Sequence, residues 1–252
     1  MKIMYILLFS ALTTTGMLSA QQTTIQVFGP GGPYPAINEA ADLYAKTHNI
    51  SIEVTKGPTG NWMDKAKINA DIIYSGAEFM MTDFINAMDG GIDETTVVPL
   101  YLRPSGLLVR PGNPKNIKDF DDIEKSGLKI LVVNGAGQTG LWEGMAGKQG
   151  NVETVKAVRK NIMHFAPNSG EAKQYWIDHP EVDVWIIWNI WQVSNPDIAD
   201  FVPVSRKYVQ YRDCGVALTK TGKQKEAVKG FYKFLQSKEA APIFKKWGWI
   251  TK

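Results

Sequence analysis

The sequence predicts an α/β protein whose two lobes are joined by two crossing strands. Short apolar strands alternate with amphipathic helical patterns, and small residues fill the turns between them. Two long extended segments, residues 97–109 and 202–216, interrupt this alternation. The alternation is typical of a parallel sheet covered by helices. The extended segments suit a chain that crosses to a second lobe and then returns.

The first twenty residues have the pattern of a secretory signal. Lys2 supplies the positive start, residues 3–12 are apolar, and Leu18-Ser19-Ala20 forms a small-residue cleavage site. The apolar run is shorter than the roughly 20 residues that a spanning helix needs. A lipoprotein would need a cysteine where Gln21 stands. We therefore expect signal cleavage, export to the periplasm and a soluble mature chain.

The first lobe is expected to hold three strand–turn–helix units. Apolar alternation predicts strands at 25–28, 50–54 and 70–74, and helical spacing follows at 37–45, 62–69 and 75–88. Ser75 fits the N-cap of the third helix, with Glu78 completing a capping box. Residues 222–252 are amphipathic and helical, and we expect them to return to this lobe.

The second lobe begins after the first extended segment. Helices are expected at 116–126, from 141, at 152–160 and at 171–177, and strands at 128–133, 162–166 and 182–188. The predicted division is a signal at 1–20, a first lobe of 21–102 with 206–252, and a second lobe of 103–205.

Composition and charge exclude several classes of protein. The chain has 252 residues, 44% hydrophobic and 21% charged, which is the range of globular proteins. A formal net charge of +3 gives no support for a nucleic-acid partner. The lone Cys214 cannot form an intramolecular disulfide, and the three histidines lie in separate elements. No metal-ligand or catalytic motif stands out, and the loose glycine pattern at 135–140 is weak support for a dinucleotide, so we expect a binder with no cofactor.

Four turns between a strand and a helix could hold an anion. Backbone N–H groups at a helix start are unpaired, and the helix dipole is positive there. Such turns lie at the carboxyl ends of strands, where open α/β sheets bind ligands. Each could also be an ordinary turn, but together they predict one shared cleft. The four turns are Gly31-Gly32, Ser75-Gly76, Thr139-Gly140 and Ser169-Gly170.

Arginine and tryptophan supply the remaining candidates. Arg103 lies in the first extended segment and is either a surface residue or a clamp for an anion. Trp185 and Trp188 are three apart in a strand and so point to opposite faces, one to the core and one to a cleft wall, whereas Trp191 is expected in the core. The full set of candidate ligand-binding residues is Gly31, Gly32, Asn61, Trp62, Ser75, Gly76, Arg103, Thr139, Gly140, Asn168, Ser169 and Trp188.

Four segments resemble the accessory colonization factor AcfC family, which is similar to the molybdate- and sulfate-type periplasmic solute-binding proteins. The segments are residues 27–33, 137–143, 165–170 and 185–197, and residues 237–249 also fit. The resemblance implies a two-lobed type II periplasmic binding fold with the ligand between the lobes. It also implies dimers that hold small carboxylates or phosphates, with Arg103 and the four turns among the ligand-binding segments.

We therefore expect an exported protein that captures a small anionic solute. It would serve ABC-type uptake, with a membrane transporter component as partner, or colonization-linked sensing. The alternative is an adhesin on the same fold, and a secreted enzyme ranks third.

Overall fold

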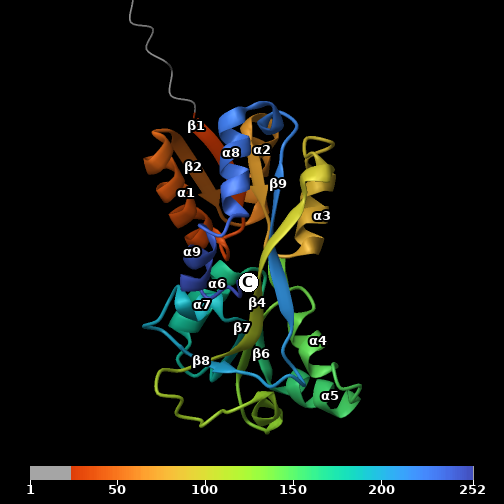
Figure 1. Cartoon of the computed structure of the whole chain (residues 1–252). Helices are drawn as coiled ribbons and strands as arrows, with labels where there is room; N and C mark the ends of the chain where they lie inside the picture. Colours follow the sequence, from red (N-terminus) through yellow and green to blue (C-terminus); the bar gives the residue numbers. More distant parts are fainter. Residues whose placement is uncertain (1–23, 252) are drawn as a thin grey trace, which may run out of the picture.

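The computed structural model describes residues 24–251, where strands and helices alternate as predicted (Figure 1). The predicted signal segment, residues 1–20, lies outside the described residues. The strands are β1 Thr24–Gly29, β2 Ser51–Lys56, β3 Ile72–Tyr74, β4 Val98–Val109, β5 Ile130–Val133, β6 Ile162–Ala166, β7 Val184–Trp188, β8 Asp200–Pro203 and β9 Tyr211–Leu218. The α-helices are α1 Tyr34–His48, α2 Met63–Asn69, α3 Glu78–Ala87, α4 Leu141–Ala146, α5 Val152–Asn161, α6 Ser169–Asp178, α7 Ile190–Val193, α8 Glu226–Leu235 and α9 Ala241–Lys246. The 3₁₀ turns are η1 Thr59–Asn61, η2 Glu94–Thr96, η3 Phe120–Glu124, η4 Ala136–Gln138 and η5 Gly222–Gln224. None of the described helices has the length and apolar character needed to cross a bilayer.

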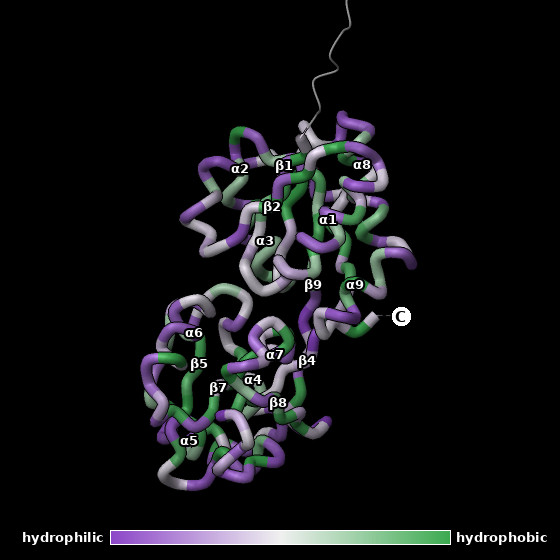
Figure 2. The backbone as a smooth tube through the Cα atoms, turned by 90° about the vertical axis from the view of Figure 1, so that its left-hand side faces the viewer, coloured by the Kyte–Doolittle hydropathy of each residue, from purple (hydrophilic) through white to green (hydrophobic). Residues whose placement is uncertain are grey.

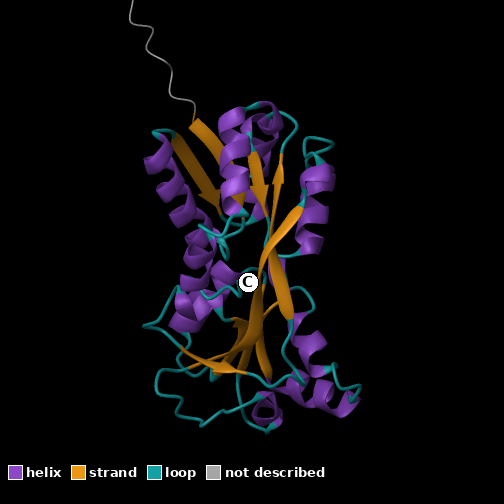
Figure 3. Cartoon of the chain, viewed as in Figure 1, coloured by secondary structure: helices purple, strands orange, loops and turns teal. Residues whose placement is uncertain are grey.

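The described strands form one sheet in the order β2-β1-β3-β9-β4-β7-β5-β6, with β8 on β4 (Figure 3). The sheet is mixed, so the expectation of a parallel sheet is wrong in part. Strand β1 is parallel to β2 and β3, and β5 is parallel to β6 and β7. Strands β4 and β9 are antiparallel to each other and to their neighbours, because one leaves the first lobe and the other returns to it.

Two bodies lie at the two ends of β4 and β9, and these strands connect them (Figure 2). The first part of β4 pairs with β9, in a register that sets Arg103 opposite Arg212. From Ser105 onward β4 pairs with β7, and from Gly106 also with β8. The crossing therefore falls close to Arg103, while the residue at which each lobe ends stays a prediction.

The first lobe packs its helices through aromatic side chains. The expected apolar face of α1 is buried, with Ile37, Ala40 and Tyr44 in the core. The Tyr44 ring lies 5.4 Å from Phe231 and 5.2 Å from Phe234 of α8. These contacts place α8 beside α1.

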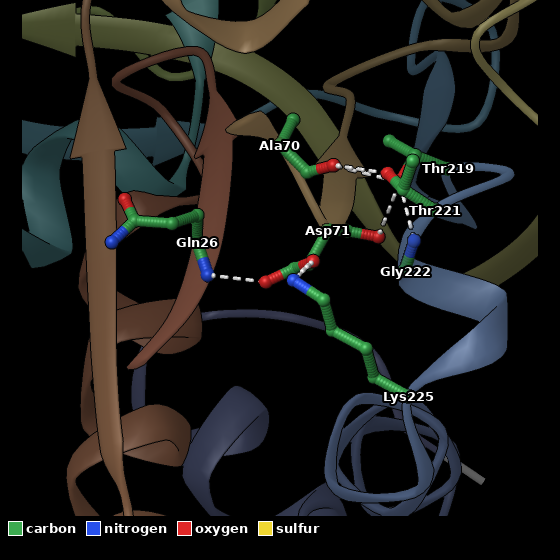
Figure 4. A network of polar contacts seen from close by, with 7 residues as sticks. All are labelled: Gln26, Ala70, Asp71, Thr219, Thr221, Gly222 and Lys225. Carbon is green, nitrogen blue, oxygen red and sulfur yellow. Dashed lines mark hydrogen bonds and ion pairs between the residues drawn. The ribbon is translucent and has the colours of Figure 1, made fainter. Parts of the chain in front are cut away.

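A buried polar network ties the strands of the first lobe together (Figure 4). Asp71 is 1% exposed. Its Oδ2 accepts from the Gln26 amide at 3.0 Å, and its Oδ1 pairs with Lys225 Nζ at 2.7 Å. The Thr219 hydroxyl donates to the Ala70 carbonyl at 2.7 Å. Both carboxylate oxygens of Asp71 thus have partners within the chain.

Two expectations about the second lobe are wrong. Residues 116–126 do not form an α-helix, because Asn116 is left-handed and the segment forms only η3, which Asp119 caps. The second extended segment is also interrupted. Between β8 and β9 the chain turns, with the amides of Tyr208 and Val209 donating to the Ser205 carbonyl. The Tyr208 ring packs 4.7 Å from Phe120 and so anchors this turn on η3.

Candidate ligand-binding site between the lobes

A cavity of about 710 Å³ lies where the two lobes face each other. Its walls come from the turn after β1, the end of β2, the start of α3, the hinge, η4, the start of α6 and the α7 region. The residues that line it are Pro30–Pro35, Lys56–Pro58, Asn61, Gly76, Met80, Arg103, Ala136–Gln138, Asn168–Glu171, Lys173, Ile190, Trp191, Ser194 and Asn195. Residues far apart in the sequence therefore share one cavity.

The cavity brings together seven of the twelve candidate residues. Those that line it are Gly31, Gly32, Asn61, Gly76, Arg103, Asn168 and Ser169. Those that do not are Trp62, Ser75, Thr139, Gly140 and Trp188. That the lining residues bind a ligand stays a prediction.

The turn before α1 has the features of an anion site. Helix α1 is 15 residues long, has no acidic residue in its first turn and carries a proline among its first positions. Its positive end is therefore not neutralised by its own side chains. A Cβ on Gly31 would have no neighbour within 4 Å, whereas one on Gly32 would lie 3.5 Å from Ile190 of the second lobe. The turn is open at Gly31 and close to the opposite lobe at Gly32.

The turn at Ser75 differs from the predicted capping box. Helix α3 begins at Glu78, with extended Ala77 as N-cap and no side-chain cap. Ser75 is buried because its amide continues the sheet by donating to the Gly215 carbonyl at 2.8 Å. Its Oγ is buried without a partner. Only Gly76 reaches the cavity, and its carbonyl accepts from Arg103 Nη2 at 2.6 Å.

The turn at Thr139-Gly140 lies away from the cavity. After β5 the chain forms the 3₁₀ turn η4, in which Ala136 is left-handed with φ 47°. The residues of η4, and not the start of α4, line the cavity. Thr139 is exposed and lines a smaller cavity of about 320 Å³ beside Phe79. Helix α4 has only six residues, so the glycine pattern at 135–140 does not open a long helix of the dinucleotide-binding kind.

The turn before α6 is occupied by its own side chains. Asn168 caps the helix, because its Oδ1 accepts from the Glu171 amide at 3.0 Å. Its Nδ2 donates to Glu171 Oε1 at 2.7 Å. The Glu171 carboxylate therefore already stabilises the positive end of α6, and this turn presents an acceptor to the cavity.

Arg103 lies at the back of the cavity and is only 2% exposed. Its Nη1 donates to the Asp213 carbonyl at 2.9 Å, and its guanidinium carbon lies 4.8 Å from the Trp188 ring and 5.0 Å from the Trp249 ring. Its Nε is buried with no partner. Burial lowers the pKa of Arg103 to about 10, so the side chain is charged at neutral pH. No acidic side chain among residues 24–251 forms an ion pair with it.

The tryptophan assignments need correction. Trp188 is fully buried and its Nε1 donates to the Gly137 carbonyl of η4 at 3.2 Å. Its ring also packs against the Arg103 guanidinium. Trp62 packs in the first-lobe core and donates to the Gly57 carbonyl at 3.1 Å. Trp191, expected in the core, is partly buried against the core and also lines the cavity. The alternation rule ends with β7, and the short helix α7 turns Trp191 toward the cavity.

The sequence reasoning missed three charged side chains that line the cavity and one that supports it. Lys56, Lys173 and Glu171 line the cavity. Lys56 is the last residue of β2, and its Nζ lies 4.0 Å from the centre of the Tyr34 ring. Arg212, opposite Arg103, donates to the carbonyls of Gly137 at 3.2 Å and Thr139 at 3.0 Å and so holds η4 in place. The signals in the sequence were the position of Lys56 at a strand end and the position of Glu171 three residues after Asn168.

The described part of the chain contains neither a cluster of metal-ligating side chains nor a reactive thiol. No group of three histidine, cysteine or acidic side chains in residues 24–251 could hold a metal ion. Cys214 is buried, and burial raises the pKa of its thiol well above the ordinary value.

Comparison with known proteins gives both a family and a fold. A family model described as bacterial extracellular solute-binding protein matches residues 25–250. Peb3 from Campylobacter jejuni is 33% identical, with a TM-score of 0.84, over 90% of this chain and 100% of that chain. A PEB3 structure with bound L-phospholactate is 32% identical, with a TM-score of 0.85 over the same shares. No curated protein sequence matches this chain.

More distant structures share the fold alone. The sulfate-binding protein SubI from Mycobacterium tuberculosis is 17% identical, with a TM-score of 0.75 over 90% of this chain and 86% of that chain. The periplasmic molybdate-binding protein of Azotobacter vinelandii is 13% identical, with a TM-score of 0.66 over 90% of this chain and 99% of that chain. These likenesses confirm the predicted type II periplasmic binding fold.

Proposed function

Because this chain belongs to the bacterial extracellular solute-binding protein family, we propose that it captures a small anion between its lobes. The anion would be of the carboxylate, phosphate-ester or sulfate type. The observation that carries the proposal is Arg103, a buried guanidinium that lines the cavity without an ion-pair partner among the described residues.

The energetics of burial support an anionic ligand. A charge removed from water loses several kcal/mol of solvation unless a partner compensates it. The carbonyl oxygens of Gly76 and Asp213 and the charge of the nearby Asp213 side chain compensate Arg103 only in part, because its Nε has no acceptor. An anion in the cavity would supply both the acceptor and the opposite charge.

The other charged residues that line the cavity also favour an anionic ligand. Three cations, Lys56, Arg103 and Lys173, line the cavity against one carboxylate, Glu171. The positive end of α1 adds backbone N–H groups. The phospholactate bound by a PEB3 structure is an anion of the same class. We propose binding without chemistry, because the described residues that line the cavity include no nucleophile paired with a base.

Contact between the lobes supports capture by closure. A Cβ on Gly76 would lie 3.3 Å from Arg103 Nη2, and one on Gly137 would lie 3.4 Å from the same atom. One glycine from each lobe thus lets both turns close on the guanidinium. Closure would exclude water and strengthen the hydrogen bonds to a bound anion.

The finer biological assignment follows from the family and the resemblance. We propose a periplasmic receptor that delivers its anion to an ABC transporter or senses it during colonization, as the AcfC-like segments imply. A homodimer is part of the same proposal. An adhesin on this fold would not need an occupied cavity, so ligand binding separates the two functions.

The test is a calorimetric and thermal-shift screen of the purified protein. Sulfate, inorganic phosphate, L-phospholactate and lactate are compared with glucose and glycine. A ligand at 100 times its dissociation constant should stabilise the fold by about 2.7 kcal/mol. Stabilisation by at least one anion is expected. Stabilisation by glucose or glycine alone, or by no compound, contradicts the proposal.

A further inference from the structure

The charges that line the cavity are distributed unevenly. The first lobe and the hinge contribute Lys56, Arg103 and the positive end of α1. The α6 region of the second lobe contributes Glu171, the one carboxylate among the described lining residues. Lys173 is two positions further along α6, and side chains at that spacing do not face each other on a helix. Lys173 therefore does not neutralise Glu171.

The Glu171 carboxylate is held in place. Asn168 Nδ2 donates to its Oε1 at 2.7 Å, and the Glu171 amide donates to Asn168 Oδ1 at 3.0 Å. These two hydrogen bonds form the helix cap and orient the Glu171 side chain at the start of α6. No described side chain donates to Oε2, which leaves one oxygen able to accept from a ligand.

We propose that Glu171 is a specificity-determining residue that selects anions carrying a hydrogen-bond donor. A carboxylate only accepts hydrogen bonds. A hydroxyl or a protonated phosphate oxygen can donate to Glu171 while the anionic end of the ligand meets Arg103. A fully ionised oxyanion such as sulfate has no hydrogen to donate and faces a like charge, which weakens its binding. The favoured class is therefore hydroxylated carboxylates and phosphates.

This inference rests on the proposed function and changes the role first given to the α6 turn. In the sequence that turn predicts an anion site, whereas Asn168 Oδ1 accepts from the Glu171 amide and the Glu171 carboxylate offsets the positive dipole. The negative end of a ligand thus belongs near the hinge and α1. Its donor belongs near α6.

The experiment compares pairs of probes that differ in one donor. At neutral pH inorganic phosphate keeps at least one hydroxyl hydrogen and sulfate has none. Lactate differs from propionate by one hydroxyl group. Titration calorimetry measures all four against the wild type, Glu171→Gln and Glu153→Gln. Glu153 is a matched control because it also sits in the first turn of an Asn-capped helix, but outside the cavity.

The wild type and Glu153→Gln should bind phosphate at least about tenfold more tightly than sulfate, because the sulfate contact is repulsive. An amide both donates and accepts, so Glu171→Gln should bring the ratio to within about threefold, mainly by improving sulfate binding. Lactate should bind to the wild type more tightly than propionate, because only lactate can donate a hydroxyl hydrogen to Glu171.

Two outcomes overturn the inference while leaving the proposed function intact. One is a wild type that binds sulfate as tightly as phosphate. The other is a Glu171→Gln variant that keeps the wild-type ratio. Absence of binding by every anion would instead overturn the proposed function. Melting temperatures of the three proteins show whether each variant is folded.

Discussion

Two buried charges in this molecule have opposite surroundings. Asp71 in the first lobe has a partner for each carboxylate oxygen, from Gln26 and Lys225. Arg103 at the hinge is equally buried, but its Nε has no partner. Ser75, Gln138 and Asp213, which lie in the neighbouring turns and strand, also have buried side-chain oxygens without partners.

We interpret this difference as one between a charge with a structural role, Asp71, and a charge that we propose binds the ligand, Arg103. Native proteins satisfy nearly all buried polar groups, so several unsatisfied ones in one place need an explanation. The residues of the Asp71 network do not line the cavity, and they join the strands of the first lobe to the start of α8 (Figure 4). This structural role explains why Asp71 is buried. Arg103 lines the cavity, and an anion bound there would supply the acceptor that its Nε lacks.

The largest expected effect is on stability, at Asp71. Asp71→Ala removes the ion pair with Lys225 and the acceptor of the Gln26 amide, and should lower the free energy of unfolding by about 3 kcal/mol. Urea denaturation measures it, with exposed Asp42→Ala as control. Anion affinity should remain within about twofold of wild type. A loss of affinity without loss of stability would reverse the roles assigned to the two regions.

Arg103→Met should show the opposite pattern. The apolar side chain removes a buried charge whose desolvation is only partly compensated, so the unliganded protein should change by no more than about 1 kcal/mol. The affinity for inorganic phosphate should fall by about 100-fold, because charge-assisted hydrogen bonds are lost. Calorimetry and urea denaturation are run on the same sample. Unchanged affinity removes Arg103 from the site.

Arg212→Ala sharpens the comparison within the hinge. Arg212 lies opposite Arg103, but its donors go to the carbonyls of Gly137 and Thr139. Removing it should loosen η4 and weaken phosphate binding by about tenfold, since two charged hydrogen bonds to the turn are lost. Exposed Arg206→Ala is the matched control. A loss as large as that of Arg103→Met would indicate direct contact between Arg212 and the ligand.

The smallest expected effect is at an exposed pair. The Lys223 ammonium and the Thr95 hydroxyl hold the pKa of Asp93 at about 2. Because the folded pKa is lowered, the stability from this pair is present above the ordinary carboxyl pKa of about 4 and is lost as the pH falls toward 2. Asp93→Asn should lower the urea midpoint slightly at neutral pH. The two midpoints should converge near pH 2. A gap that widens with acidity would show that the sign is wrong.

The sequence pattern predicts most of the fold because periodicity reports burial directly. The bounds of β6 and the apolar face of α1 are predicted correctly. The 116–126 segment fails because its helical spacing is local, whereas left-handed Asn116 and the Asp119 cap set the backbone. A periodic pattern cannot report such turns.

The site is predicted less completely, because partners decide what a turn does. The turn at Gly31-Gly32 lines the cavity as expected, and so does Arg103. Thr139 does not, because η4 is inserted before α4. The Asn168-x-x-Glu171 spacing is typical of a capped helix start. Whether the turn can still bind an anion depends on the hydrogen bonds between these two residues, which the structure shows.

The most direct test is the NMR signal of the Arg103 Nε–H group during titration with inorganic phosphate. The signal is assigned by its absence in Arg103→Met. We expect it to shift to lower field and to saturate with the dissociation constant that calorimetry gives, because the Nε gains a charged acceptor. A signal that stays fixed while phosphate binds would contradict the claim that the unpartnered arginine receives the anion.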